Sequence, residues 1–439
     1  MSVTISDSPG AHDVTRGERA VVIGVERAGR GDGRSAEAKL EEAVGLAEAI
    51  GIDVVARRTF RLRAPKPGTL LGKGQIEEIA AIATDNEAAL LVVDSALTPI
   101  QQKSLEEQAG TKVIDRTSLI LEIFGERAAS AEGRLQVELA HLDYQAGRLV
   151  RSWTHLERQR GGFGFLGGPG ETQIEADRRL IRDRMARIRR ELEQVKRTRS
   201  LHRGRRQRAP WPVIALVGYT NAGKSTLFNR MTGGEVLAED MLFATLDPTM
   251  RDVRLPGIDK AILSDTVGFV SDLPTQLVAA FRATLEEVAS ADLLIHVRDM
   301  SHPDRDAQRD DVEQVLAQLG IGPDDEGAPP RIEAWNKIDL LGRLEREALL
   351  TEAQRREDAV PISALSGLGM DDLRERVAET LKSGEQVHDI RLPASDGGKI
   401  AWLHARGDVL DQRTSGSKID LRVRLSAENW ARFQALQSA

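Results

Sequence analysis

The chain has 439 residues, enough for several domains that each bury a core, and its 41% hydrophobic and 29% charged residues are typical of a soluble globular protein. It contains no cysteine, which excludes disulfides, thiolate metal sites and cysteine nucleophiles, and no apolar run approaches the ~20 residues of a membrane span. The net charge of −7 argues against a simple nucleic-acid binder. Residues 1–19 are polar and lack the apolar core of a secretory signal, so we predict a disordered tail and a cytoplasmic protein.

Residues 20–127 alternate between apolar strand-like runs and helical patterns. Such alternation predicts an α/β domain with a mostly parallel sheet. The predicted strands span residues 20–25, 52–56, 90–94 and 113–114, and the predicted helices span residues 36–50, 75–83 and 99–109.

Residues 128–200 carry two apolar stripes at heptad spacing, which predict two long helices packed against each other. The first stripe is Leu135, Leu139, Leu142, Ala146, Leu149 and Trp153, and the second is Ile174, Ile181, Met185, Ile188, Leu192 and Val195. Between them the Gly-rich stretch 161–170 is predicted to be non-helical. We interpret the region as an antiparallel helical hairpin whose tip presents Phe163, Phe165 and Leu166.

The hairpin is basic. One arm carries Arg148, Arg151, Arg158 and Arg160, and residues 178–208 hold 14 Lys/Arg against 3 Asp/Glu, a local charge of +11. A solvated helix face is the alternative interpretation, but charge of one sign destabilises a helix by self-repulsion. Exposed apolar side chains at the tip are also unfavourable in water without a partner. The hairpin therefore predicts a polyanionic partner such as RNA.

Residues 201–210 are interpreted as a basic linker and residues 211–383 as a nucleotide-binding domain. The apolar run 213–217 leads into G-x-x-x-x-G-K-S and then a helical segment, which is the P-loop arrangement for a nucleoside triphosphate. Its backbone N–H groups bind phosphate oxygens, Lys224 binds the β- and γ-phosphates, and the Ser225 hydroxyl ligates Mg²⁺. The residues assigned to this loop are Gly218, Tyr219, Thr220, Asn221, Ala222, Gly223, Lys224, Ser225 and Thr226.

A D-x-x-G motif, formed by Asp265, Thr266, Val267 and Gly268, follows another predicted strand. Asp265 would reach Mg²⁺ through water, and the Gly268 N–H would sense the γ-phosphate. Ras-like GTPases place a Gln directly after this motif to orient the attacking water, whereas this chain has Phe269. We therefore predict slow hydrolysis by the isolated protein, completed by groups that a partner supplies or rearranges.

The nucleobase is indicated by Asn336, Lys337, Ile338 and Asp339, an N-K-x-D motif. The Asp339 carboxylate can accept from the ring N–H and the exocyclic amine of guanine, and adenine would leave it unpaired. Asn336 would brace the loops, and the Lys337 stem would cover the base. A further segment follows a predicted strand and could bring a backbone N–H to the guanine oxygen. It consists of Ser363, Ala364 and Leu365.

A predicted switch loop lies between the P-loop and the D-x-x-G motif. It contains Phe243, Ala244, Thr245, Leu246 and Asp247. Such a loop needs a threonine whose hydroxyl ligates Mg²⁺ and whose N–H meets the γ-phosphate. Thr245 is the first choice and Thr249 the second, and either is alternatively an ordinary turn residue. The catalytic assignment is therefore Lys224, Thr245 and Gly268, and the protein ligands of Mg²⁺ are Ser225 and Thr245.

Residues 384–439 are predicted to form a small C-terminal α/β domain to which we assign no chemistry. Its predicted strands span residues 387–392 and 419–424, and its predicted helices span residues 400–410 and 428–436. The expected fold class is thus multidomain α/β: an N-terminal α/β domain with a long helical hairpin, a P-loop GTPase domain with a mostly parallel sheet, and this small domain.

The combination of motifs resembles the HflX family of translation-factor-class GTPases over about residues 21–381. The motifs are Gly-Tyr-Thr-Asn-Ala-Gly-Lys-Ser, Phe-Ala-Thr-Leu-Asp-Pro-Thr, Asp-Thr-Val-Gly-Phe, Asn-Lys-Ile-Asp and, upstream, Gly-Gly-Pro-Gly-Glu-Thr-Gln. The resemblance implies a cytoplasmic GTPase that uses GTP/GDP and Mg²⁺ and binds the large ribosomal subunit, with its N-terminal regions on ribosomal RNA near the peptidyl-transferase centre. It also implies ribosome-stimulated hydrolysis and the splitting or rescue of stalled ribosomes under stress. ATP use is a secondary expectation, given Asp339.

Two other functions stay open on the sequence alone. One is a checkpoint GTPase in assembly of the large subunit, and the other is a non-catalytic GTP-sensing adaptor whose hairpin binds a protein. We expect a monomer without a membrane span.

Overall fold

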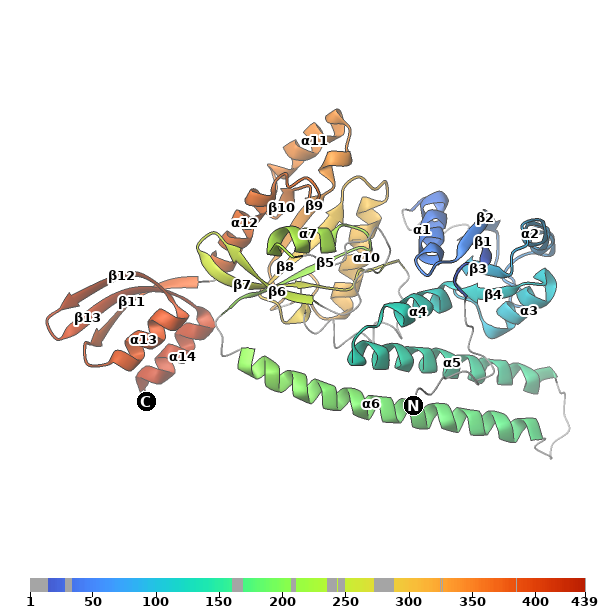
Figure 1. The fold of residues 1–439 in the computed structure, drawn as a ribbon, viewed down its shortest axis with the longest axis horizontal. Coiled ribbons are helices and arrows are strands. Elements are labelled where there is room, and N and C mark those ends of the chain that lie inside the picture. The colour runs from blue at the N-terminus through green and yellow to red at the C-terminus, as the bar shows by residue number, and fades with distance from the viewer. Residues whose placement is uncertain are drawn as a thin grey trace.

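The molecule is elongated, with three domains in a row and a helical hairpin along one side (Figure 1). In the computed structural model the described residues are 15–27, 34–159, 169–206, 211–234, 243, 249–271, 288–323, 325, 327–383 and 385–438. Within these ranges no helix combines the length and apolar character that crossing a membrane requires. The multidomain α/β class predicted from the sequence is confirmed.

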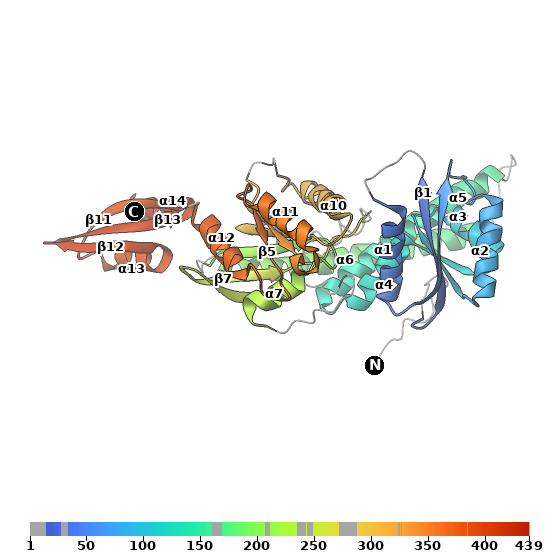
Figure 2. The same ribbon diagram turned by 90° about the horizontal axis from the view of Figure 1, so that it is seen from above.

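The N-terminal domain is a four-stranded parallel sheet with helices on both faces. Its elements are β1 (Arg19–Arg27), α1 (Ala36–Glu48), β2 (Asp53–Leu62), α2 (Lys73–Asp85), β3 (Leu90–Asp94), α3 (Pro99–Ala109), β4 (Lys112–Asp115) and α4 (Arg116–Arg127). The strand order is β2-β1-β3-β4. Helices α1 and α4 cover the face toward the central domain and α2 covers the opposite face (Figure 2).

Helix α4 is an element that the sequence pattern did not predict. The Asp115 carboxylate caps its N-terminus by accepting from the Ser118 N–H at 2.8 Å. Five of its apolar side chains are buried, and three of them are consecutive, so no polar face marks a helical period in this run. They are Leu119, Ile120, Leu121, Ile123 and Phe124.

The hairpin consists of α5 (Ala131–Gln159) and α6 (Pro169–Arg206), which run side by side in opposite directions (Figure 1). Met185 and Ile188 of the predicted α6 stripe are buried. Arg184 donates to both carboxylate oxygens of Glu138 on α5, at 2.6 and 2.9 Å. The predicted non-helical stretch is too long, because Pro169 and Gly170 form the first turn of α6, a position that proline favours. Phe163, Phe165 and Leu166 lie outside the described residues.

One arginine that the sequence assigned to the basic surface is used inside the protein. Arg148 on α5 is half-buried and donates to the Tyr144 hydroxyl and to the Gln102 side-chain oxygen. Its guanidinium also lies 3.8 Å from the Asp115 carboxylate. The interpretation of Arg148 as part of the polyanion-binding surface is therefore wrong. The exposed basic residues of α6 keep that interpretation open, and they include Arg179, Arg182, Arg187, Arg189 and Arg190.

The central domain is a six-stranded sheet in the order β10-β9-β8-β5-β7-β6. Neighbouring strands are parallel except β6, which pairs antiparallel with β7, so the mostly parallel sheet is confirmed. Its elements include β5 (Val213–Gly218), α7 (Lys224–Thr232), β6 (Thr249–Leu255), β7 (Ile258–Asp265), β8 (Leu293–Asp299), α10 (Arg305–Gln318), β9 (Arg331–Asn336), η1 (Ile338–Leu340), α11 (Arg343–Ala353), β10 (Ala359–Pro361) and α12 (Met370–Ser383). The carboxyl ends of β5, β7, β9 and β10 therefore meet at one edge of the sheet.

The C-terminal domain has three antiparallel strands in the order β11-β13-β12, with two helices packed on one face. Its elements are β11 (Glu385–Pro393), α13 (Gly397–Arg406), β12 (Asp408–Ser415), β13 (Lys418–Ser426) and α14 (Ala427–Ser438). The predicted helix 400–410 is too long, because a Cβ at Gly407 would lie 2.5 Å from the Val423 side chain and the chain turns there into β12. Strand β12 was not predicted because its residues are mostly polar.

The other face of this sheet carries a set of charged residues that we call the C-terminal charge lattice. Register places Arg391, Asp420 and Arg413 in one row across the three strands, and Asp389, Arg422 and Asp411 in the next. Positive and negative side chains thus alternate in both directions. Arg391 donates to Asp420 at 3.0 Å, although the Arg391 side chain is 65% exposed.

Candidate nucleotide-binding site

The P-loop connects β5 to α7 at the carboxyl edge of the central sheet. The backbone φ angles of Gly218 and Gly223 are 151° and 94°, values that favour glycine. A Cβ at Gly218 would lie 2.3 Å from the Val297 carbonyl oxygen, and a Cβ at Gly223 would lie 2.2 Å from Nδ2 of Asn336. Both conformation and space therefore require glycine at these two positions.

Lys224 is the first residue of α7 and is buried. Its ammonium group donates to the carbonyl oxygens of Gly218 at 3.0 Å and of Tyr219 at 2.7 Å. Burial lowers the pKa of Lys224 from the usual 10.5 to about 8, against the opposing attraction of the Asp265 carboxylate. An anion that enters the loop would restore the full charge of this group, which suits Lys224 to binding phosphate.

Ser225 and Asp265 bring two oxygen ligands together beside Lys224. The Ser225 hydroxyl donates to Oδ2 of Asp265 at 2.8 Å, and Asp265 ends β7 fully buried. Hydroxyl and carboxylate oxygens are the ligands that Mg²⁺ prefers, so these residues fit the metal. Among the described residues no group of three or more His, Cys, Asp or Glu could hold a metal ion. A Mg²⁺ ion at this position would also require phosphate oxygens and water.

The D-x-x-G segment lies alongside the P-loop. The Phe269 N–H donates to the Gly218 carbonyl at 3.1 Å, and the Thr220 N–H donates to the Phe269 carbonyl at 2.7 Å. A Cβ at Gly268 would lie 3.0 Å from Nζ of Lys224, so the backbone of Gly268 closely approaches the ammonium group. These contacts bring the D-x-x-G glycine and the P-loop lysine to one place.

The side chains of this segment point into the protein. Thr266 donates to the Leu216 carbonyl at 2.5 Å, and Val267 is buried. Phe269 is 1% exposed and belongs to the apolar cluster that joins the N-terminal and central domains. A buried phenyl ring has no group that can hold an attacking water, so the position used by Gln in Ras-like GTPases makes no such contact here.

Asn336 connects three loops at the end of β9. Its Nδ2 donates to the Ala222 carbonyl at 2.8 Å, and its Oδ1 accepts from the Ala364 N–H at 2.9 Å. The first contact reaches the P-loop, and the second reaches the segment that contains buried Ser363 and the 72% exposed Leu365. Three of the five segments assigned to the nucleotide, namely the P-loop, the N-K-x-D motif and residues 363–365, therefore meet through one side chain.

The residues after Asn336 turn toward solvent. Lys337 has φ of 63°, and its ammonium lies 2.8 Å from an Asp299 carboxylate oxygen. Ile338 is buried, whereas Asp339 is exposed. The Asp339 carboxylate is thus accessible to the nucleobase of a bound nucleotide. Beside it, the ion pair with Asp299 holds the Lys337 side chain in place.

One residue of the predicted switch loop is described. Phe243 is buried, and its ring lies edge-on to Phe124 of α4 with a centroid distance of 4.6 Å. The second threonine candidate, Thr249, begins β6 and pairs across the ladder with Asp265. The rest of the loop lies outside the described residues, namely Ala244, Thr245, Leu246 and Asp247.

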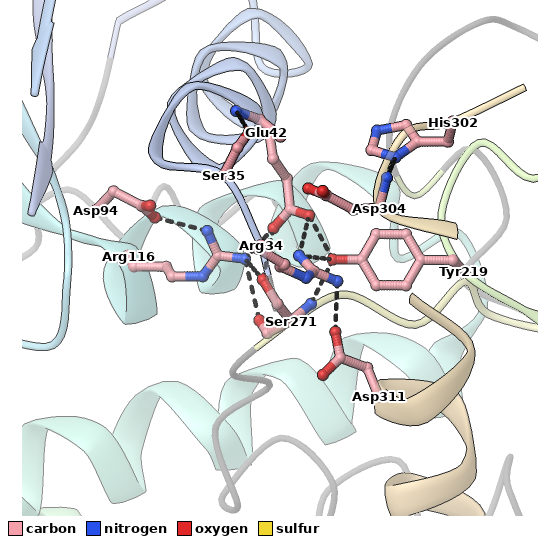
Figure 3. A network of polar contacts seen from close by, with 11 residues as sticks. Arg34, Ser35, Glu42, Asp94, Arg116, Tyr219, Ser271, His302, Asp304 and Asp311 are labelled. Atoms are coloured by element: carbon pink, nitrogen blue, oxygen red, sulfur yellow. Dashed lines mark hydrogen bonds and ion pairs between the residues drawn. The ribbon is translucent and has the colours of Figure 1, made fainter. Parts of the chain in front are cut away.

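A buried polar network joins the P-loop to the N-terminal domain (Figure 3). The Tyr219 hydroxyl donates to Glu42 of α1 and accepts from the Arg34 guanidinium at 3.0 Å. It also accepts from the Ser271 N–H at 2.7 Å, two residues after Phe269. Arg34 in turn pairs with Asp311 of α10 at 2.5 Å. The second P-loop residue is therefore fixed by groups from both domains.

Arg116, the first residue of α4, forms the other half of this network. It pairs with Glu42 and with Asp94, the latter at 2.6 Å. It donates to the Ser271 carbonyl at 3.0 Å and hydroxyl at 2.9 Å, and that hydroxyl donates to Glu42 at 2.7 Å. We call these residues the interdomain cluster. Its members are Arg34, Glu42, Asp94, Arg116, Tyr219, Ser271 and Asp311.

The cluster has defined charge states at neutral pH. Burial acts to raise the pKa of Glu42, but the guanidinium groups of Arg116 and Arg34 outweigh it and lower the pKa. Burial and the Glu42 carboxylate both raise the pKa of Tyr219, so its hydroxyl stays protonated as a donor. Each charge in the cluster has a partner of opposite charge, which is the condition for holding ions in a protein interior.

Sequence analysis missed this cluster apart from Tyr219. Its members are up to 277 residues apart along the chain, and none of them other than Tyr219 belongs to a recognisable motif. A tyrosine in the second position of the P-loop was the available signal. Its hydroxyl needs a hydrogen-bond partner when buried, which points to a neighbouring domain.

Three sequence families match consecutive parts of the chain. Residues 37–125 match the family described as GTP-binding GTPase N-terminal, residues 127–206 match GTP-binding GTPase Middle Region, and residues 213–337 match 50S ribosome-binding GTPase.

Individual proteins show similarity over most of the chain. A GTPase HflX of Magnetococcus marinus is 48% identical over 395 residues, 90% of each chain. A GTPase HflX of Escherichia coli K12 is 40% identical over 395 residues, 90% of this chain and 91% of the other. Among solved structures, the complex of SsGBP with GDP is 25% identical, covers 83% of this chain and 99% of that one, and has a TM-score of 0.47.

Proposed function

The chain belongs to the HflX family of GTPases, and from this we propose that it binds the large ribosomal subunit, hydrolyses GTP to GDP there, and splits or rescues stalled ribosomes under stress. The match of residues 213–337 to the 50S ribosome-binding GTPase family supports the choice of partner. The observation that carries the proposal is the interdomain cluster, because it connects the nucleotide site to the domain that bears the hairpin.

In this proposal each site residue has one role. Lys224 binds the β- and γ-phosphates, and the N–H of Gly268 contacts the γ-phosphate. Ser225 and Thr245 would hold Mg²⁺, with Asp265 close to it, and the metal would neutralise phosphate charge when bound. Guanine is read by the carboxylate of exposed Asp339. Competition between GTP and ATP, measured with the wild type and with Asp339→Asn, tests the specificity for guanine.

The catalytic site is proposed to be incomplete in the isolated protein. Phe269 is buried, so its side chain offers no group to the attacking water. Hydrolysis by the protein alone is then slow, and ribosome binding supplies or rearranges the missing group. Fast turnover by the isolated protein, unchanged by subunits, would contradict this part of the proposal.

Nucleotide state is proposed to reach the hairpin through three contacts. Tyr219 of the P-loop and Ser271 beyond the D-x-x-G motif bind Glu42, and Phe243 of the switch loop packs on Phe124. Segments that respond to the γ-phosphate therefore touch α1 and α4 directly, and α5 follows α4 in the chain. A shift at the nucleotide changes how the N-terminal domain and its hairpin are held.

Cosedimentation with isolated large and small subunits tests the partner and the coupling. The protein should pellet with large subunits, and a non-hydrolysable GTP analogue should tighten binding by about 10-fold over GDP, a coupling of about 1.4 kcal/mol. Equal binding in both nucleotide states, or binding to small subunits alone, would overturn the proposal. Binding that weakens steeply between 50 and 200 mM salt indicates RNA contacts, as expected from counterion release. Binding that does not depend on salt would favour a protein-binding adaptor.

Variants of the hairpin tip separate splitting from an assembly checkpoint. Phe163→Ala with Phe165→Ala should abolish subunit dissociation while large-subunit binding survives. Dissociation at the wild-type rate by this double variant would argue for the checkpoint function. Light scattering of 70S particles gives the dissociation rate.

A further inference from the structure

Thr220, the third residue of the P-loop, has a buried hydroxyl whose role is not explained by the backbone cradle. The residue is 5% exposed, and its Oγ1 has no hydrogen-bond partner among the residues that the structure describes. Native proteins leave few buried polar groups unpaired, because a buried hydroxyl without a hydrogen-bond partner loses its bonds to water and gains none in return. The described residues around it therefore supply no partner for this hydroxyl, which leaves it available to a ligand.

The position of Thr220 indicates where such a partner would come from. Its N–H donates to the Phe269 carbonyl at 2.7 Å. A Cβ at Gly268 would lie 2.9 Å from Cγ2 of Thr220 and 3.0 Å from Nζ of Lys224. The Thr220 side chain and the Lys224 ammonium thus both lie against the backbone of Gly268, whose N–H is assigned above to the terminal phosphate.

Neighbouring side chains do not duplicate this hydroxyl. The Tyr219 hydroxyl is held by Glu42, Arg34 and Ser271 of the interdomain cluster. Phe269 is an apolar residue, and Asn221 is exposed. Thr220 therefore carries a buried hydroxyl on a side chain that lies against the D-x-x-G glycine.

We propose that the Thr220 hydroxyl donates a hydrogen bond to the terminal phosphate of bound GTP and so distinguishes GTP from GDP. A hydroxyl bound to an ionised phosphate oxygen forms a short, charge-assisted hydrogen bond. GDP lacks this oxygen and leaves the hydroxyl unpaired. The proposal rests on the GTPase site described above and is independent of the ribosomal partner.

Thr220→Val tests the proposal because valine keeps the shape of threonine and removes the hydroxyl. Affinities for GDP and for a non-hydrolysable GTP analogue are measured on the full chain without ribosomes. The variant should bind the analogue about 10-fold or more weakly and bind GDP within about 2-fold of the wild type. Thr220→Ser should restore the analogue affinity, because it retains the hydroxyl.

Ser264→Ala is the matched control. Ser264 is 1% exposed in β7, and its hydroxyl likewise has no partner within the described part of the chain, but it lies outside the P-loop. Its loss should leave the ratio of the two affinities unchanged. An unchanged ratio in Thr220→Val, an equal loss for both nucleotides, or a Thr220→Ser variant as weak as Thr220→Val would each overturn the proposal. Failure of ribosome binding would leave these affinities intact, so the two proposals fail separately.

Discussion

Two regions of the molecule use the same chemistry, arginine paired with carboxylate, in opposite surroundings. In the interdomain cluster the side chains of Arg116 and Glu42 are 7% and 11% exposed. In the C-terminal charge lattice the side chains of Arg391 and Asp420 are 65% and 37% exposed. The contacts have similar lengths, yet water screens only the second set. Burial, more than contact length, therefore decides how strongly such a pair couples the elements that it joins.

The largest effect should come from deleting one cation of the buried cluster. Arg116→Ala removes the partner shared by Glu42, Asp94 and Ser271. Because it leaves buried carboxylates with less positive charge, the opening free energy of α1 and β3 amides should fall by about 3–5 kcal/mol. Hydrogen exchange measures the opening free energy of each region separately, which suits a multidomain protein.

Arg391→Ala in the charge lattice is the control for that experiment. Because its pair with Asp420 is exposed and screened by water, the local opening free energy should stay close to that of the wild type. Similar losses in the two variants would show that burial does not separate the regions.

Double-mutant cycles should give a second, smaller contrast. The cycle of Glu42→Gln with Arg116→Met should yield an interaction energy of about 2 kcal/mol, because the two side chains contact each other in the interior. The cycle of Asp420→Asn with Arg391→Met should yield a much smaller interaction energy, which added salt should abolish. A salt-sensitive Glu42–Arg116 term would contradict the burial argument.

Tyr219→Phe should have a still smaller effect on stability, with a specific effect on coupling. Loss of the hydroxyl removes hydrogen bonds to charged groups worth about 1.5 kcal/mol in net stability. The change in hydrogen exchange of α1 and α4 between the GTP-analogue and GDP states should shrink. If that difference persists at full size, the interdomain cluster does not transmit nucleotide state.

Lys224 is a buried cation of a third kind, because carbonyl oxygens at 2.7 and 3.0 Å hold it in place of a paired carboxylate. Burial lowers its pKa to about 8, whereas the pKa of Arg116 is raised, since its carboxylates outweigh burial. Between about pH 8 and 10.5 the unfolded chain binds more protons at this residue, so its contribution to the stability of the nucleotide-free protein increases with pH.

Nucleotide phosphates should return the missing proton to Lys224. Binding of GDP at pH 8 should therefore take up about half a proton, and affinity should fall as pH rises above 8. Calorimetry in buffers of different ionisation enthalpy measures the uptake. Binding heats that do not depend on the buffer would contradict the lowered pKa.

Local patterns explain what the sequence predicted well. The alternation before residue 127, the P-loop and the N-K-x-D motif depend on neighbours a few positions apart. Helix α4 escaped prediction because its apolar residues are buried on several sides, and β12 because its residues are mostly polar. Arg148 was predicted to be a surface cation, because the sequence does not show that the fold brings Gln102 and Tyr144 beside it. Glu42 and Arg116 were not predictable, because their meeting with Ser271 depends on how two domains dock.

The length of α6 has a mechanical consequence. Its 38 residues form a rod of about 57 Å that ends just before the strand leading into the P-loop. Because displacement grows with distance from the pivot, a rotation of about 5° about the end next to β5 moves the far end by about 5 Å. Figure 1 shows α5 lying beside it over much of this length, so the pair can turn as one stiff lever. A small rotation where α6 approaches β5 therefore becomes, at the opposite end of the rod, a displacement the size of an amino-acid side chain.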